Sequence, residues 1–277
     1  MPAKTILSVV GVDHGEADLL AAAEVAQEAE AHLAAVVVGC VPPPPVTTFA
    51  GEPYSAYAVA WEEEYGRVAQ KAKDLSEKLA QHGYAGDVQP IYALIGNVAD
   101  EIAQRATYAD LTLLGDVLAK DKDLLKLVLD GALFASPSPV VLGGKKKTTL
   151  APKKMLIAWN GKREAAVAVR HAIELLTMAE DVHVVIIDPE AAAQAMGEEP
   201  GADIATWLAR HGIKITVDVL ASGGRDPALV LQRHALDIGA DLIVMGAYGR
   251  TRLRERIFGG TTQTMLSNVD TPVFMAR

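Results

Sequence analysis

Short apolar runs alternate with longer amphipathic stretches along the whole chain. The stretch 162–180 predicts a helix, because its apolar side chains recur at the spacing of one helical face. These side chains are Ala166, Val169, Ile173 and Leu176. The apolar runs of the second half are short enough for strands and lie at 155–159, 182–187, 213–220, 242–245 and 272–275. Strands that alternate with helices favour a mainly parallel sheet covered by helices.

Local signals mark where several helices begin and end. Gly212 suits the C-terminal cap of a helix that ends near His211. Asp226 followed by Pro227 is typical of the start of the next helix. A last short helix is expected from about Thr261, after a glycine-rich loop.

The first half of the chain follows the same order of elements. Its first helical stripe consists of small and branched apolar residues: Ala22, Val25, Ala26, Ala29 and Leu33. Strands are expected around 36–38 and 88–91, and a helix over 96–106. We interpret the proline-rich segment 42–57 as a surface loop, with a cover over a ligand pocket as the alternative.

Three sequence segments occur twice in the same order. Residues 109–115 return as 240–246, 137–142 return as 270–275, and 4–9 correspond to 154–159. The chain is therefore two copies of one unit. We place the first copy at residues 1–144 and the second at 154–277. The glycines, lysines and proline of 145–153 and its flanks predict a solvated linker.

The predicted fold is α/β, with two tandem, open, mainly parallel five-stranded sheets flanked by helices in a Rossmann-like arrangement. The last strands of the two copies, 140–142 and 273–275, can pair with each other, since strand edges seek partners, and the family resemblance described below implies this pairing. That pairing would make an intramolecular pseudo-dimer, and assembly of two chains into a homodimer stays open.

Composition narrows the classes of partner. The chain has 277 residues and a net charge of −9, which disfavours nucleic acid and anionic membranes as partners. It contains no long apolar run of the kind that spans a membrane. One cysteine, Cys40, excludes an internal disulfide and favours a reducing compartment. We expect a cytoplasmic protein.

The richest candidate chemistry follows the predicted strand 242–245. Open α/β sheets bind ligands beyond the carboxyl ends of their strands. Here a loop contains four glycines, then Thr261 and Thr262 at a helix start, and four arginines between positions 250 and 256. Glycine backbone, helix N–H groups and cations together predict a phosphate site. The alternative is a tight strand-to-helix turn with a solvated basic face.

The spacing Gly246-x2-Gly249-x9-Gly259 in this context resembles the glycine motif of the universal stress protein family, and the chain resembles a tandem member. The family carries Ser or Thr directly after the last glycine, where this chain has Gly260; Thr261 and Thr262 follow. The resemblance implies a fold like that of the adenine nucleotide alpha hydrolases. It also implies an ATP site in the second copy, with Mg²⁺ as an accompanying ion, and a regulatory stress-response role with slow or no ATP turnover.

The resemblance also implies where the nucleotide lies. The base or ribose would sit beyond Ala158 and Trp159 at Asn160, where members often have Asp. Asn160 can donate and accept hydrogen bonds, but Asn160-Gly161 is also a strong turn pair, and both interpretations stay open. Ile187 would form an apolar wall. The phosphate side of the site would be bordered by Met245 and Tyr248.

The first copy lacks this chemistry. After Gly115 the chain continues with Asp116, which repels phosphate, and Leu118 replaces the second glycine. We expect the first copy to supply architecture or a different pocket. The sequence indicates no catalytic residue, and its seven histidines show no metal-ligand spacing, so no metal site is expected.

Two other functions remain in view. One is a scaffold or binding protein that holds an apolar ligand or a protein partner and no nucleotide. The other is an ATP-consuming enzyme, for which Glu255 is the sole acidic candidate in the loop that carries the glycine motif.

Overall fold

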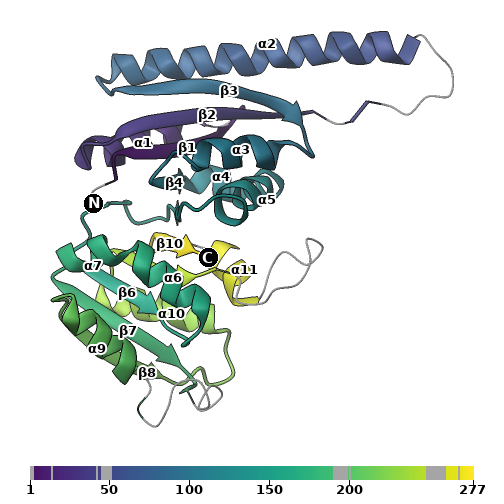
Figure 1. Cartoon of the computed structure of the whole chain (residues 1–277). Helices are drawn as coiled ribbons and strands as arrows, with labels where there is room; N and C mark the ends of the chain where they lie inside the picture. The colour runs from purple at the N-terminus through teal and green to yellow at the C-terminus, as the bar shows by residue number, and fades with distance from the viewer. Residues whose placement is uncertain are drawn as a thin grey trace. The chain divides into compact units, whose positions relative to one another are not determined.

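The computed structural model describes residues 3–13, 15–41, 43–44, 52–189, 199, 201–247, 260–267 and 269–277. Packing divides the chain into an N-terminal unit, Ala3–Ser138, and a C-terminal unit, Pro139–Arg277. Both are drawn in Figure 1. Within the described ranges, every helix is too short or too polar to cross a membrane.

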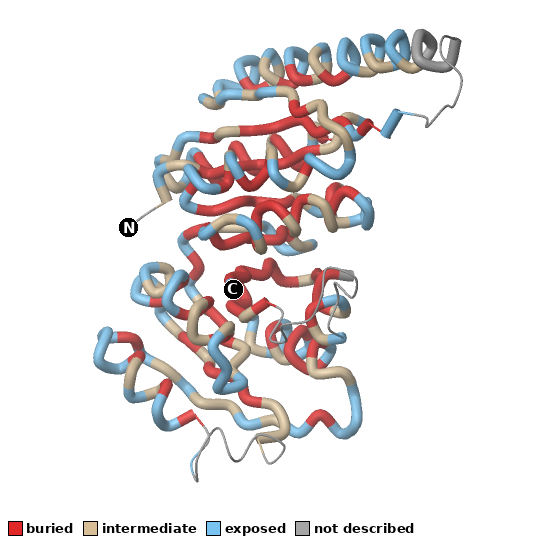
Figure 2. The backbone as a smooth tube through the Cα atoms, turned by 45° about the vertical axis from the view of Figure 1, so that its right-hand side comes forward, coloured by how far each residue is buried: buried red, intermediate tan, exposed pale blue. Residues whose placement is uncertain are grey.

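The N-terminal unit is built on four parallel strands in the order β3-β2-β1-β4. The strands are β1 (Thr5–Gly11), β2 (His32–Val41), β3 (Gly86–Leu94) and β4 (Leu111–Leu114). The helical segments are α1 (Glu16–Glu28), α2 (Glu52–Gln81), α3 (Val98–Ala106), α4 (Asp116–Lys120), α5 (Lys122–Leu129) and η1 (Asp130–Phe134). The central strands are buried along most of their length, while the helices bury one face (Figure 2).

Two predictions for this unit are wrong. Leu33 is not part of the first helix, because α1 ends at Glu28 and Leu33 lies in β2, where it pairs with Ile6 of β1. The segment 42–57 is not a loop throughout, because α2 begins at Glu52 and packs along β2 and β3. The rest of that segment lies outside the described residues, apart from the exposed positions 43 and 44.

The C-terminal unit contains six strands in the order β5-β10-β9-β6-β7-β8. The strands are β5 (Val140–Leu142), β6 (Lys154–Ala158), β7 (Asp181–Ile187), β8 (Ile215–Leu220), β9 (Leu242–Gly246) and β10 (Val273–Ala276). The helices are α6 (Arg163–His171), α7 (Ile173–Met178), α9 (Ala202–Arg210), α10 (Pro227–Ile238) and α11 (Gly260–Ser267). Apart from β5, neighbouring strands are parallel, which confirms the predicted α/β class.

The predicted pairing of the two last strands is confirmed. β5 runs antiparallel to β10, with Val141 opposite Phe274 and Leu142 opposite Val273. Both strands are fully buried, so apolar side chains and ladder hydrogen bonds hold the pair together. Because β5 joins this ladder, the packing boundary falls at Ser138, six residues before the end of the first sequence copy at Gly144.

The cap predictions also hold. Asp226 accepts a hydrogen bond from the backbone N–H of Ala228, and Pro227 opens α10. Gly212 follows α9 with a φ of +77°, the left-handed conformation that glycine adopts without strain. The predicted helix 162–180 is divided into α6 and α7 at Ala172.

The segment after β5 has exposed lysines that pair with carboxylates of the C-terminal unit. The ammonium of Lys145 lies 2.7 Å from Asp270, and that of Lys146 lies 2.6 Å from Asp241. Backbone N–H groups of both lysines donate to the carbonyls of Val269 and Asp270. The segment is therefore fixed to the C-terminal unit by charge pairs and backbone hydrogen bonds.

Candidate functional site

The carboxyl ends of β6, β7 and β9 bring several predicted site residues together. Ala158 is in register with Met245 on one side and with Val185 on the other. The backbone N–H of Trp159 donates to the carbonyl of Val185 at 2.9 Å. The sequence expectation that strands one and four of the second copy share one edge is therefore met.

The side chains at this edge form an apolar floor. Met245 is buried, whereas Ile187 and Trp159 are half-buried, each at the end of its strand. Half-buried apolar groups at the open end of a parallel sheet can contact a flat, weakly polar ligand.

Gly246 has a packing reason for being glycine. A Cβ placed there would overlap the backbone of Glu164 and Ala165 in the first turn of α6. The absence of a side chain lets α6 approach the carboxyl end of β9 directly. Gly246 thus shapes the edge through packing, whatever binds there.

Asn160 forms a turn. Its side-chain Oδ1 accepts a hydrogen bond from the backbone N–H of Lys162 at 3.0 Å, and Gly161 has a φ of +70°. The residue is exposed, so its amide nitrogen faces solvent. Of the two interpretations of Asn160, the turn is observed, and contact with a base stays a prediction.

The helix that follows the glycine motif begins at Gly260. A Cβ at Gly260 would meet nothing within 4 Å, Thr261 is half-buried and Thr262 is 6% exposed. One turn further, the hydroxyl of Thr264 donates to Asp226 at 2.6 Å, which ties α11 to the start of α10. Tyr248, Gly249 and Gly259 lie outside the described residues, as do the four arginines and Glu255.

The turn after β4 in the N-terminal unit holds a carboxylate of the chain itself. Asp18 of α1 accepts hydrogen bonds from the backbone N–H groups of Val117 at 3.1 Å and Leu118 at 2.8 Å. Asp18 is 6% exposed, and Gly115 packs directly against its side chain. The N–H groups that start α4 are therefore already bonded to an anion.

Burial raises the pKa of Asp18, and the two backbone hydrogen bonds oppose this rise without cancelling it. Asp18 is not among the site residues predicted from the sequence. A signal was present, because Asp18 falls on the same helical face as the buried residues Ala22 and Val25. A carboxylate on an apolar face requires a buried partner, and here the partner is backbone.

Comparison with known proteins agrees with this architecture. The sequence profile of the Universal stress protein family matches residues 152–277. A universal stress protein from Synechocystis sp. is 28% identical over 147 residues, which cover 51% of this chain and 47% of that protein. The match thus spans about half the length of that relative.

Two solved structures share the fold over nearly the whole chain. One is a universal stress protein from Archaeoglobus fulgidus DSM 4304, with a TM-score of 0.60 at 16% identity, covering 98% of this chain and 96% of that one. The other is a functionally unknown protein from Pseudomonas aeruginosa PAO1, with a TM-score of 0.57 at 19% identity, covering 99% and 92%. The profile of the Universal stress protein family thus matches the C-terminal part of this chain, residues 152–277, and the two solved structures share its fold over nearly the whole chain.

Proposed function

We propose that the C-terminal unit binds ATP, or a related adenine nucleotide, at the carboxyl edge of β6, β7 and β9. The N-terminal unit binds no nucleotide at the turn after β4. The bound nucleotide acts as a regulatory ligand in a stress response and is hydrolysed slowly or not at all.

The contrast between the two turns carries the proposal. In the N-terminal unit, Asp18 accepts from the N–H groups after β4 and leaves no room for a phosphate. At the start of α11, by contrast, Gly260 is exposed and faces open space. Among the residues that the structure describes, no side chain accepts from the backbone of Gly260, Thr261 or Thr262. These N–H groups remain available for an oxyanion.

The remaining residues fit a nucleotide. Ile187 and Met245 offer an apolar surface to the base, and the exposed amide of Asn160 offers it polar partners. The arginines of the loop between β9 and α11 supply positive charge for the phosphates. The Mg²⁺ that accompanies ATP would be held mainly by phosphate oxygens and water.

The polar side chains proposed to contact the nucleotide favour slow turnover. Asn160, Thr261 and Thr262 can bind and orient the nucleotide. Their amide and hydroxyl groups do not accept a proton from water near neutral pH. Hydrolysis would need a base that these residues do not provide.

Calorimetric titration of the full chain with Mg·ATP tests the proposal. We expect saturation at one nucleotide per chain. A Gly249→Val, Gly259→Val double variant should lose binding, because each Cβ obstructs backbone approach to phosphate. The matched control is Gly96→Val, a turn in the N-terminal unit where a Cβ meets nothing within 4 Å. It should bind like wild type.

Each other outcome is informative. Two equivalents would contradict the role given to Asp18. Absence of binding at millimolar ATP, with the protein folded, would overturn the nucleotide function and favour the scaffold alternative. Sustained phosphate release that disappears in Glu255→Gln would instead favour an ATP-consuming enzyme.

A further inference from the structure

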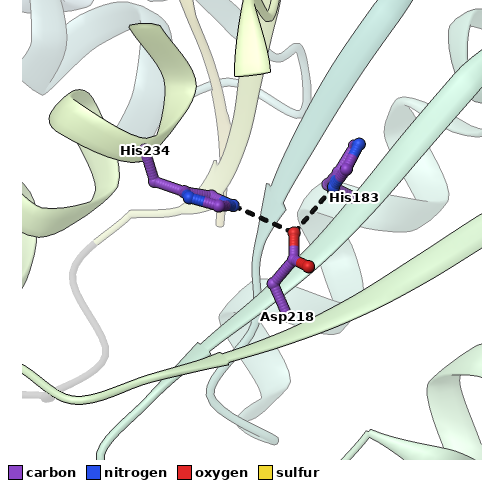
Figure 3. A group of neighbouring side chains, drawn as sticks. All are labelled: His183, Asp218 and His234. Atoms are coloured by element: carbon purple, nitrogen blue, oxygen red, sulfur yellow. Dashed lines mark hydrogen bonds and ion pairs between the residues drawn. The ribbon is translucent and has the colours of Figure 1, made fainter. Parts of the chain in front are cut away.

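Three polar side chains from separate elements of the C-terminal unit converge on one point (Figure 3). His183 lies on β7, Asp218 on β8 and His234 on α10. Asp218 is in register with Val185, two residues from His183, so the side chains of His183 and Asp218 point to the same face of the sheet. His234 reaches that point from the helix.

Both imidazole rings contact the same carboxylate oxygen. Nδ1 of His183 lies 2.6 Å and Nε2 of His234 lies 2.9 Å from Oδ2 of Asp218. The three side chains are 14%, 20% and 21% exposed for His183, His234 and Asp218. The cluster is thus shielded by its surroundings but still reachable from solvent.

The second nitrogen of His183 also faces a carboxylate. Its Nε2 lies 3.3 Å from Oδ2 of Asp181, and Asp181 is held by the ammonium of Lys154 at 2.9 Å. A neutral imidazole carries one N–H and can donate to one of the two carboxylates. Satisfying both contacts requires a positive charge, either a proton on the ring or a metal ion on its Nδ1 side.

A metal ion at Nδ1 would leave Nε2–H of His183 free to keep its contact with Asp181. Nε2–H of His183 would then donate to Asp181, the arrangement in which a carboxylate orients a metal-bound histidine.

We propose that His183, Asp218 and His234 bind a divalent transition-metal ion, with zinc as the expected occupant. Two imidazoles and one carboxylate favour zinc or a neighbouring first-row metal over Mg²⁺ and Ca²⁺, which prefer all-oxygen sites. Ligand atoms around tetrahedral zinc lie about 3.3 Å apart, given bonds of about 2.0–2.1 Å. The two contacts of Asp218, at 2.6 and 2.9 Å, reach that spacing when the side chains separate by less than an ångström, and the three ligand atoms all lie within 4.8 Å of one another.

The proposed metal site is distinct from the nucleotide edge. His183 is in register with Leu156, two residues before Ala158 at the end of β6. Three protein ligands leave one position of a tetrahedral ion open to water, so the site can hold an exchangeable ligand. Occupancy would also link α10 to β7 and β8 and stabilise the folded unit.

This cluster could not be recognised from the sequence, because its members are 35 and 16 positions apart and form no short motif. Only the parallel register of β7 and β8, with α10 packed above them, brings them together. The expectation that the histidines carry no metal rested on linear spacing alone.

The test is a titration of untagged, chelator-stripped full chain with Zn²⁺, and with Co²⁺ as a spectroscopic probe. We expect one saturable equivalent, a tetrahedral Co²⁺ absorption spectrum, and a rise in melting temperature that a chelator reverses. His234→Gln and Asp218→Asn should remove this equivalent. Asp181→Asn should weaken binding about 10- to 100-fold, because it removes the group that orients His183.

His32→Gln is the matched control, because His32 also contacts a carboxylate, Asp87, at 3.0 Å but has no second histidine there. It should bind zinc like wild type. Loss of one equivalent in this variant, or binding unchanged in His234→Gln, would overturn the proposal. So would absence of saturable binding; a protonated His183 would then hold the cluster, and its ring resonances would show the proton in metal-free protein.

Discussion

The helices that follow β4 and β9, α4 and α11, differ in the described partners of their first backbone N–H groups. In the N-terminal unit, the N–H groups of Val117 and Leu118 bind the carboxylate of Asp18. In the C-terminal unit, α11 starts at an exposed Gly260 with open space around it. The N-terminal unit thus supplies its own anion, whereas among the residues that the structure describes no side chain accepts from the first N–H groups of α11.

The glycines at the ends of β4 and β9 are both explained by packing. Gly115 packs against the side chain of Asp18, and Gly246 packs against the backbone of α6. The glycine at the carboxyl end of β4 or β9 is therefore required by packing in both units and says little about ligands. The informative difference lies in what the following N–H groups bind.

The largest expected effect concerns these packing constraints. Gly246→Ala should lower the free energy of unfolding by about 3 kcal/mol, because the new Cβ would overlap the backbone of Glu164 and Ala165. Gly260→Ala is the control, since a Cβ there meets nothing, and it should change stability by less than about 0.5 kcal/mol. Urea denaturation measures both. Equal losses in the two variants would refute the distinction between a packing glycine and an open one.

Asp18→Ala tests the difference between the two units more directly. It removes the acceptor of two backbone N–H groups, one of them on the buried residue Leu118. We expect a loss of about 1–2 kcal/mol at pH 7, somewhat less than two such bonds would suggest, because burial already penalises the ionised carboxylate.

The freed N–H groups should then bind an external anion. Sulfate at constant ionic strength should raise the melting temperature of Asp18→Ala more than that of wild type. An equal response of both proteins would mean that the turn after β4 offers no anion site once Asp18 is gone.

Asp18 should also make the free energy of unfolding depend on pH, and the raised pKa fixes the direction of this smaller effect. Its pKa is raised above the ordinary value of 3.8, so the folded state holds this proton more tightly than the unfolded state. The proton-linked part of the stability that Asp18 contributes is therefore greatest below pH 3.8 and is lost as pH rises through the folded pKa. Relative to Asp18→Asn, wild type should gain stability as pH falls toward 3.8. Denaturation curves at several pH values measure this difference, and a gain with rising pH would contradict the burial argument.

The sequence predicted the arrangement of strands well, because apolar runs and their repetition depend on local pattern. The pairing of 140–142 with 273–275 followed from two buried edge strands that needed partners. The start of α2 at Glu52 was missed, because prolines at 42–45 suggested a longer loop.

The site was predicted less completely, for a physical reason. Ala158, Met245 and Gly246 could be placed together, since parallel strands end at one edge. Asp18 and the cluster of His183, Asp218 and His234 could not, because their partners lie far away in sequence. Contacts that depend on register or helix packing leave no short motif to recognise.

The smallest expected change in stability is at Asn160, which forms an observed turn and is proposed to contact the ligand. Asn160→Ala should cost about 1 kcal/mol, because the backbone N–H of Lys162 loses its acceptor. Asn160→Asp keeps an acceptor oxygen and should leave stability within about 0.5 kcal/mol of wild type.

Their effects on ATP affinity should differ from their effects on stability. If the side chain contacts the base or ribose, Asn160→Asp should change ATP affinity in calorimetry even though the turn is intact, and Asn160→Ala should weaken it. If Asn160 serves only the turn, Asn160→Asp should bind ATP like wild type. That result would confine the nucleotide contacts to the apolar edge and the start of α11, and would make the open helix N-terminus the main difference between the two units.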